Sequence, residues 1–296
     1  MKKIKYFLVV SFLLFTGVIF LIYKDVARVN IYNTLSLWLN NVLVALIPFY
    51  FLSNILINYP FISKIFYHLF NRIFRFENTT SCSLFLLSFI TGNPTSSYLV
   101  ISEVKNNTIS IEEGNRLLRG TVLSSPLFTI LMISKWGLFI YLVQIFVSNL
   151  LFLIFKRKNT KENIHGYNKK DIIKLIDDCP MVMLTILSSM IFVCMFKIPL
   201  YKLQELFKLN NSVFVTFLID SMELTTGLNC IIGYNIEDTL KVLLQTFFLS
   251  FGGLSIIVQI LSELKKTNLS KTSLVLSRFI HGLISSLIMF FLMIFF

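Results

Sequence analysis

Thr91-Gly92-Asn93-Pro94-Thr95-Ser96-Ser97 is the stretch of sequence that decides the fold. It lies in the middle of a run without charged residues, Asn78 to Ser102, that is long enough to cross a membrane. Seven consecutive residues of polar, Gly or Pro type break a helix, and backbone groups freed in this way cannot face lipid. They must be buried in protein or line a watery cavity. The stretch therefore predicts a broken or re-entrant helix inside a membrane protein.

The composition of the whole chain supports this class. Of 296 residues, 55% are hydrophobic and 14% are charged, and the mean hydropathy is +0.77. A soluble domain carries roughly a quarter charged residues. At about 20 apolar residues per spanning helix, we predict an all-α polytopic membrane protein with about eight or nine membrane segments. The net charge of +12 lies in short loops between apolar runs, so we interpret it as a topology signal and expect no nucleic acid partner.

Motifs of several function classes are absent from the sequence. There is no Gly-x-x-x-x-Gly-Lys-Ser/Thr run, which excludes an ATPase within this chain. There is also no His-Glu-x-x-His or Gly-x-Ser-x-Gly motif. The four cysteines and three histidines lie far apart, so neighbouring residues do not form a metal site. We predict a protein that is not an enzyme and that holds neither a metal nor a cofactor.

Residues 1–58 form the first predicted unit. The basic stretch Met1-Lys2-Lys3-Ile4-Lys5 precedes the uncharged run Tyr6 to Tyr23, which predicts an uncleaved anchor with its N-terminus in the cytoplasm. A second span is expected from about Leu35 to Ile57. Pro48 lies inside that span and is expected to kink it, because proline removes a backbone donor.

Residues 59–155 form the unit around the deciding stretch. Charged and apolar residues alternate at helical spacing from Phe61 to Arg75, which predicts an amphipathic helix in the membrane interface, with a soluble partner-binding helix as the alternative. Ser110 and Glu113 form a capping box that begins a short helix. Two spans are then expected, at about Gly120 to Ile133 and Leu138 to Phe155.

The loop from Lys156 to Lys174 carries seven basic residues against two acidic ones, which is typical of a cytoplasmic loop. Because two spans precede this loop, we expect the Ser110 helix on the cytoplasmic side as well. The Phe61 helix follows the first two spans of the chain, which begins in the cytoplasm, so we expect it on that side too. The Gly92 segment must then enter and leave the membrane on one side. We therefore expect a re-entrant hairpin there and assign residues 156–180 to a basic cytoplasmic loop.

Residues 181–296 form the last unit. Its expected segments are a span at Met181 to Phe196, an interfacial stretch at Lys197 to Leu209, interrupted segments at Val213 to Ile232 and Leu240 to Ser262, and a last span at Leu274 to Phe296. The interruptions lie at Asp220 to Gly227 and at Gly252-Gly253. An offset of 160 aligns Gly92 with Gly252 and pairs two breaks, which predicts two internally repeated halves, an inverted repeat.

Three motifs in this order carry a resemblance to a known family. They are Gly92-x-Pro94 with the Ser110 helix and Ser125-Pro126-Leu127-Phe128; Glu223-Leu224-Thr225-Thr226-Gly227; and Ser250-Phe251-Gly252-Gly253-Leu254-Ser255 with Gln259. The chain resembles the YlbJ-like sporulation integral membrane proteins, also called stage V sporulation protein V. Their core is related to the nucleoside-recognition gate domain of concentrative nucleoside transporters. The resemblance therefore implies that residues 59–155 and residues 181–296 each form a gate-like half.

The resemblance implies a sporulation transporter that carries a small anionic metabolite, dipicolinic acid, across the forespore membrane. It implies an integral protein of the bacterial cell membrane or outer forespore membrane, with the lipid bilayer and a small anionic substrate as partners, and a homo-oligomer or other sporulation membrane proteins as further partners. Ser96-Ser97-Tyr98 replaces the Gly-Ala-Lys of the family. A non-transporting sporulation factor and a nucleoside-like solute transporter are therefore the alternatives.

The candidate site combines the breaks with the motif residues. The candidate substrate-binding residues are Gly92, Asn93, Pro94, Thr95, Ser96, Ser125, Thr225, Thr226, Gly227, Gly252, Gly253, Ser255 and Gln259. Helix N-termini at such breaks present free N–H groups to an anion. Glu223 is the candidate coupling residue, because an intramembrane carboxylate is functional by default.

Two basic residues near the C-terminus lie outside the candidate site. Arg278 and His281 lie one turn apart and would offer positive charge to a carboxylate, but we expect Arg278 to occupy an interface position with its charged end in water.

Overall fold

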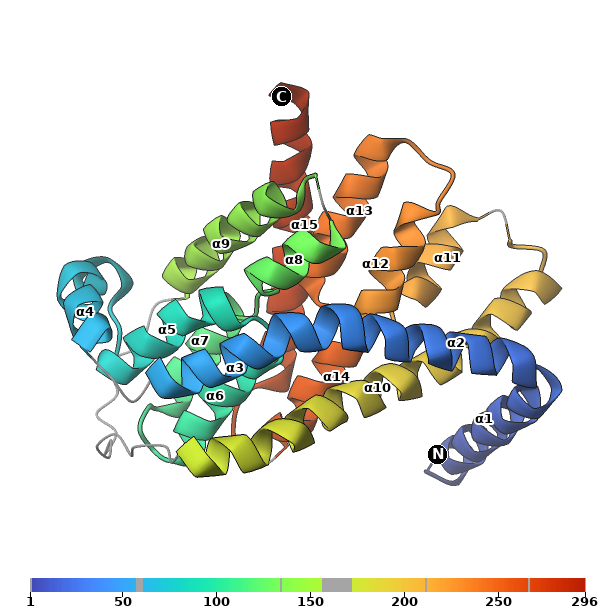
Figure 1. Ribbon diagram of the computed structural model, residues 1–296, viewed down its shortest axis with the longest axis horizontal. Helices are drawn as coiled ribbons and strands as arrows, with labels where there is room; N and C mark the ends of the chain where they lie inside the picture. Colours follow the sequence, from blue (N-terminus) through green and yellow to red (C-terminus); the bar gives the residue numbers. More distant parts are fainter. Residues whose placement is uncertain are drawn as a thin grey trace.

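The computed structural model describes residues 2–56, 61–133, 135–155, 172–210, 212–265 and 267–295. Within these ranges the chain is helical and contains no strand (Figure 1). Five described helices are long and apolar enough to cross a membrane, at Lys24–Leu56, Gly137–Ile154, Ile173–Leu206, Asp238–Leu264 and Lys271–Phe295. The predicted all-α class is confirmed, and these helices fit an integral membrane protein. The count of eight or nine segments and the internal repeat stay predictions.

The N-terminal part folds as a short helix followed by a long one. The elements are α1 (Lys2–Ile22), α2 (Lys24–Leu37), the π-helix η1 (Trp38–Leu43) and α3 (Val44–Leu56). The last three run on without a loop, so the second span begins earlier than the predicted Leu35. Pro48 lies inside α3, five residues after the end of the π-helical stretch. Single π-helical turns of this kind often occur at functional sites.

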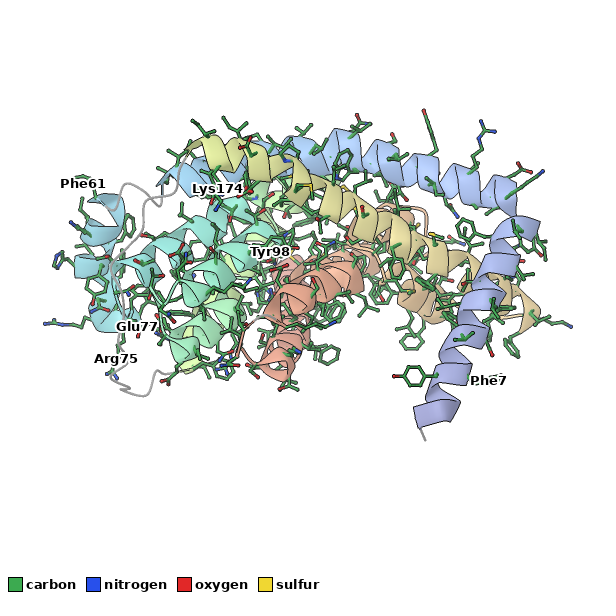
Figure 2. All side chains as sticks on the ribbon, turned by 90° about the horizontal axis from the view of Figure 1, so that it is seen from below. Phe7, Phe61, Arg75, Glu77, Tyr98 and Lys174 are labelled. Carbon is green, nitrogen blue, oxygen red and sulfur yellow. The ribbon has the colours of Figure 1, made fainter. Side chains whose placement is uncertain are left out.

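Helix α4 (Phe61–Phe74) confirms the predicted amphipathic helix. Its apolar residues Phe61, Leu69 and Ile73 are all more than half exposed, which suits contact with lipid. Figure 2 places Phe61 of α4 and Phe7 of α1 at opposite ends of the molecule.

Helices α5 (Thr79–Thr91) and α6 (Thr95–Lys105) confirm the predicted helix break at Gly92, and they contact each other. Helix α7 (Ile111–Gly120) begins at the predicted cap, where the Ser110 hydroxyl accepts from the Glu113 backbone N–H at 3.2 Å.

The segment predicted as one span at Gly120 to Ile133 is instead interrupted. Residues 121–125 are not helical, and α8 (Pro126–Met132) is a single short helix that begins after them. The start of α8 is fixed locally, because the Ser125 hydroxyl caps the N–H of Phe128 and Pro126 occupies the first helical position. Helix α9 (Gly137–Ile154) then forms the span that was predicted there.

Helix α10 (Ile172–Leu206) corrects a second prediction. Lys197 was expected to begin an interfacial stretch, yet α10 continues through it and the Lys197 side chain is buried. The helix runs alongside α2 and α3 (Figure 1). Most of the predicted basic loop, residues 156–171, lies outside the described residues.

The C-terminal part contains the two remaining predicted breaks. Its elements are α11 (Val213–Asp220), α12 (Leu224–Ile232), α13 (Asp238–Phe251), α14 (Gly253–Leu264) and α15 (Lys271–Phe295). The first break is shorter than predicted, because helix resumes directly after Glu223. The second break lies at Gly252, as predicted.

Candidate functional site

A cavity of about 40 Å³ lies where the interrupted helices meet. Its polar lining is Asn93, Ser124, Ser125, Glu223, Thr225, Ser255 and Gln259, together with Pro94 and Gly252 at two helix breaks, and its apolar lining is Val42, Leu46, Phe128, Ile186, Met190, Leu224, Leu249 and Ile256. The polar lining comes from segments far apart in the sequence. The structure thus brings together residues that were selected separately, from different breaks.

Four helices begin at this cavity. Pro94, Ser125, Glu223 and Gly252 are the N-cap residues of α6, α8, α12 and α14, and all four line the cavity. The first backbone N–H groups of a helix have no partner within the helix, and its dipole places positive charge at that end. The helix dipoles therefore favour negative charge at the cavity, and the carboxylate of Glu223 already supplies part of it.

The break at Gly92 is held against the segment before α8. The Asn93 backbone N–H donates to the Leu123 carbonyl at 2.7 Å. Gly92 has φ +67, and a Cβ at this position would lie 2.3 Å from the Ser125 backbone nitrogen. Glycine is required here both by the positive φ and by the close approach of the two backbones.

The break at Gly252 and Gly253 is held in the same way against the segment before α12. The backbone N–H groups of Leu254 and Ser255 donate to the carbonyls of Ser221 and Met222, at 3.1 and 2.9 Å. A Cβ on Gly253 would lie 3.1 Å from the backbone nitrogen of Leu224.

Gly252 has more room than either of the other two glycines. A Cβ there would meet only the side chain of Ile256, at 4.0 Å. Gly253, rather than the predicted Gly252, is therefore the geometric counterpart of Gly92.

Glu223 caps α12 with both carboxylate oxygens. They accept from the backbone N–H groups of Thr225 at 3.1 Å and Thr226 at 2.7 Å. The side chain is buried, which supports the interpretation that this carboxylate lies inside the protein rather than at an interface. Two of the roughly four lone-pair directions of the carboxylate are thereby used, and the residue also faces the cavity.

Replacing Glu223 by Gln is expected to lower the free energy of unfolding by about 1–3 kcal/mol, the value of a hydrogen bond to a charged group. The Gln amide has one acceptor oxygen, so its NH₂ group would face a backbone N–H. Glu223→Asp, which keeps a charged N-cap acceptor, serves as the control. Unfolding of the purified protein in mixed micelles with increasing SDS, followed by circular dichroism, measures both variants. Equal stability of Glu223→Gln and the unchanged protein would contradict the capping role.

Several predicted site residues lie beside the cavity rather than in its lining. Thr95 is buried, and its hydroxyl has no hydrogen-bond partner among the described residues. The Ser96 hydroxyl lies 3.2 Å from Asn93 Oδ1 and 3.3 Å from the Thr121 carbonyl. Gly227 lies inside α12, where a Cβ would meet the ring of Phe248.

Thr226 belongs to a second cavity, of about 110 Å³, between α2, α10, α11 and α12. Its hydroxyl accepts from Lys197 Nζ at 2.9 Å, and Lys197 Nζ also lies 3.5 Å from Asp220 Oδ1. Tyr201 and Tyr234 donate to the two oxygens of Asp220, the latter at 2.6 Å. Asp220 and Lys197 are both buried, so this second cavity contains a satisfied ion pair.

The sequence did not single out the apolar lining. Val42, Leu46, Ile186 and Met190 come from long helices of uniform apolar composition, and no local signal separates them from residues that face lipid. Ser124 was also missed. Its position next to the Ser125-Pro126 helix start, in an otherwise uncharged run, is the signal that marks it.

No family model, curated protein or solved structure matches this chain. Among the described residues, no group of three or more His, Cys, Asp or Glu side chains is placed to hold a metal ion.

Proposed function

We propose that the protein is a membrane transporter that moves a small organic anion through the cavity between the interrupted helices. The observation that supports this most is the meeting of four helix N-caps, from separate parts of the chain, at one cavity. Interrupted helices with their N-terminal ends directed at an anionic group are the usual construction of a transporter site at mid-membrane.

The two sides of the cavity suit an anion with a flat apolar body. Its polar wall offers helix N-termini and the side chains of Ser125, Ser255 and Gln259, whereas Phe128, Ile186 and Met190 form an apolar wall. An aromatic ring with carboxylates matches both walls. Dipicolinate, which the resemblance to sporulation proteins suggests, is a molecule of this kind.

The cavity must enlarge during transport. Its volume of about 40 Å³ is close to that of a single water in the liquid, about 30 Å³, whereas sites for drug-sized ligands begin at about 300 Å³. We therefore interpret the structure as a closed state in which the two membrane sides are separated. The hydrogen bonds that join the paired breaks hold this state, and the apolar wall of α3 and α10 is the side that is free to move.

The proposal includes the finer topology. It includes eight or nine membrane segments in two repeated halves and an N-terminus in the cytoplasm. It also includes a location in the bacterial cell membrane or outer forespore membrane. Association with a second copy or with other sporulation membrane proteins is compatible with the exposed apolar faces of α1 and α4.

Flux into proteoliposomes tests the function. Vesicles containing the purified protein and terbium, which becomes luminescent when dipicolinate binds it, are expected to take up external dipicolinate faster than vesicles without protein. Uridine and benzoate serve as competitors that distinguish a nucleoside-like site and a monocarboxylate site. No flux of any of these solutes, with the protein correctly inserted, would overturn the transporter and favour the non-transporting sporulation factor.

A further inference from the structure

Arg278 of α15 is buried without a partner. Its side chain is 1% exposed, and among the described residues no hydrogen-bond partner exists for its Nε, Nη1 or Nη2 atoms. The expectation that its charged end lies in water at the interface is therefore wrong. Arg278 is also the bulkiest of the fully buried side chains.

A buried guanidinium without a partner would be strongly stabilised by an anion bound beside it. Arginine stays protonated in proteins, so it does not avoid the penalty of burial by becoming neutral. Removing a charge from water without compensation is among the most unfavourable changes a protein interior contains. No carboxylate forms an ion pair with Arg278 within the described part of the chain.

Among the described residues, other buried polar atoms without hydrogen-bond partners lie on α15 and on two helices that contact it. They are Gln144 Nε2 on α9, Ser250 Oγ on α13 and Ser285 Oγ on α15. Each of these groups has a hydrogen to donate, as the guanidinium does, although the hydroxyls also accept. Buried polar atoms normally have partners, so these groups add to the case for a missing acceptor that Arg278 makes.

His281 supplies a second and independent observation. Its Nδ1 lies 3.0 Å from the Ser250 carbonyl oxygen, and its Nε2 lies 3.1 Å from the Gln144 carbonyl oxygen. Carbonyl oxygens only accept, and a neutral imidazole donates from only one nitrogen. Both bonds form together only when the ring is protonated. In a neutral ring, Nε2 accepts instead from the Ser148 hydroxyl at 3.4 Å.

Neither residue is among those that line the cavity of the proposed transport site, but helix α15 and Gln144 connect them to it. Ser286 and His281 contact the carbonyls of Leu243 and Ser250, so α15 runs antiparallel to α13 and brings Arg278 level with the break after Ser250. Gln144 provides a direct link, because its side-chain oxygen accepts from the cavity residue Ser124 at 2.8 Å and its carbonyl faces His281.

We propose that Arg278 and His281 form an anion site in which a small carboxylate binds together with one proton, which is taken up by the His281 ring. The bound carboxylate pairs with Arg278, and protonation of His281 completes its two carbonyl hydrogen bonds. The proton thus enters with the anion, which couples the proposed transport to a proton gradient. This inference rests on the proposed function and gives the coupling role to His281 rather than Glu223.

The charged groups on neighbouring helices have other partners, which leaves Arg278 as the charged neighbour that acts on His281. Arg116 bonds to Glu113 within α7, and Arg119 bonds to Ser273. Lys241 of α13 pairs with Asp238, and Glu263 of α14 pairs with Lys105. Tyr141 of α9 donates to the carbonyl of Phe89.

Binding measured on the detergent-purified full chain tests the site. Titration calorimetry with dipicolinate in two buffers of different ionisation enthalpy is expected to show uptake of about one proton per anion above pH 7, where an ordinary His is neutral. In His281→Gln the anion should bind with no proton uptake. Proton uptake that is unchanged in His281→Gln would overturn the coupling.

Arg278→Met separates a ligand-binding role from a structural one. Because it removes an uncompensated buried charge, the ligand-free variant is expected to have a higher Tm than the unchanged protein, whereas dipicolinate should bind at least about tenfold more weakly, as for loss of a charge-assisted bond. A lower Tm with undiminished dipicolinate affinity would overturn the site. The control is Arg119→Gln, which changes an arginine of α7 that has a partner, Ser273 of α15, and this variant should bind dipicolinate with unchanged affinity.

The two proposals fail in different ways. If proteoliposomes show no flux while the purified protein binds dipicolinate with a proton, the transporter proposal fails and the site stands. If flux occurs and neither Arg278→Met nor His281→Gln alters it or its pH dependence, the site fails alone.

Discussion

Gly92→Ala is expected to lower the free energy of unfolding by about 2–5 kcal/mol. The new Cβ would lie 2.3 Å from the backbone nitrogen of Ser125 and 2.8 Å from its Cα, so the two backbones must separate. Overpacking of this kind costs about 1–3 kcal/mol, and a non-glycine residue at φ +67 adds about 1–2 kcal/mol. Separation of the two backbones would also stretch the hydrogen bond from Asn93 to Leu123.

Unfolding in mixed micelles with increasing SDS measures this loss, and Gly252→Ala is the matched control. Gly252 also has a positive φ, of +93, but a Cβ there has space. Gly252→Ala should therefore lower the free energy of unfolding only by the cost of a non-glycine residue at positive φ, about 1–2 kcal/mol. Gly253→Ala, with its contact to Leu224 at 3.1 Å, should fall between the two. Equal losses at all three glycines would show that backbone approach is not what these breaks require.

Bulk added at Gly92 meets protein before it could meet a ligand. A Cβ there points at the Ser125 backbone, and Gly92 is not among the residues that line the cavity.

Lys197→Met is expected to lower the free energy of unfolding by about 3–5 kcal/mol, as for other buried ion pairs that lose one partner. The substitution keeps the length of the apolar side chain and leaves the Asp220 carboxylate buried without its cation. Tyr201 and Tyr234 still donate to Asp220, but neutral donors do not replace a charge. Thr226 also loses the donor to its hydroxyl.

The double variant Lys197→Met with Asp220→Asn is expected to recover much of this loss, because it leaves no unpaired charge. Lys105→Met is the control, since the pair of Lys105 and Glu263 is about one-third exposed and should be worth less than about 1 kcal/mol. The same micelle titration measures all three variants. A Lys197→Met loss no larger than that of Lys105→Met would mean that water reaches Asp220.

Much of the fold could be predicted from local patterns. The seven polar, Gly or Pro residues at 91–97 and the paired glycines at 252 and 253 predicted where helices are interrupted, because helix-breaking residues act on the local backbone. The first interruption is shorter than predicted, since α5 includes Thr91 and α6 begins at Thr95. The Ser110 cap and the amphipathic face of α4 are likewise contained in a few adjacent residues.

Where local patterns conflict with packing, the predictions failed. Lys197 in an apolar sequence is typical of a helix end at an interface, and only Asp220, more than twenty residues later, makes its burial favourable. The interruption before α8 was missed for a related reason. Residues 121–125 are stabilised by distant partners, Asn93 on one side and Gln144 on the other.

The sequence by itself determined that this chain is an all-helical protein with long apolar helices, and where several of those helices break. Hydrophobic content and helix-breaking residues act within about one helical turn, so a short stretch of sequence is enough to recognise them. Only the tertiary structure decided that the N-caps at Pro94, Ser125, Glu223 and Gly252 meet at one cavity, and that Arg278 is buried without a partner. Both facts depend on which helices pack together, and uniform apolar surfaces do not encode that choice in any short stretch of sequence.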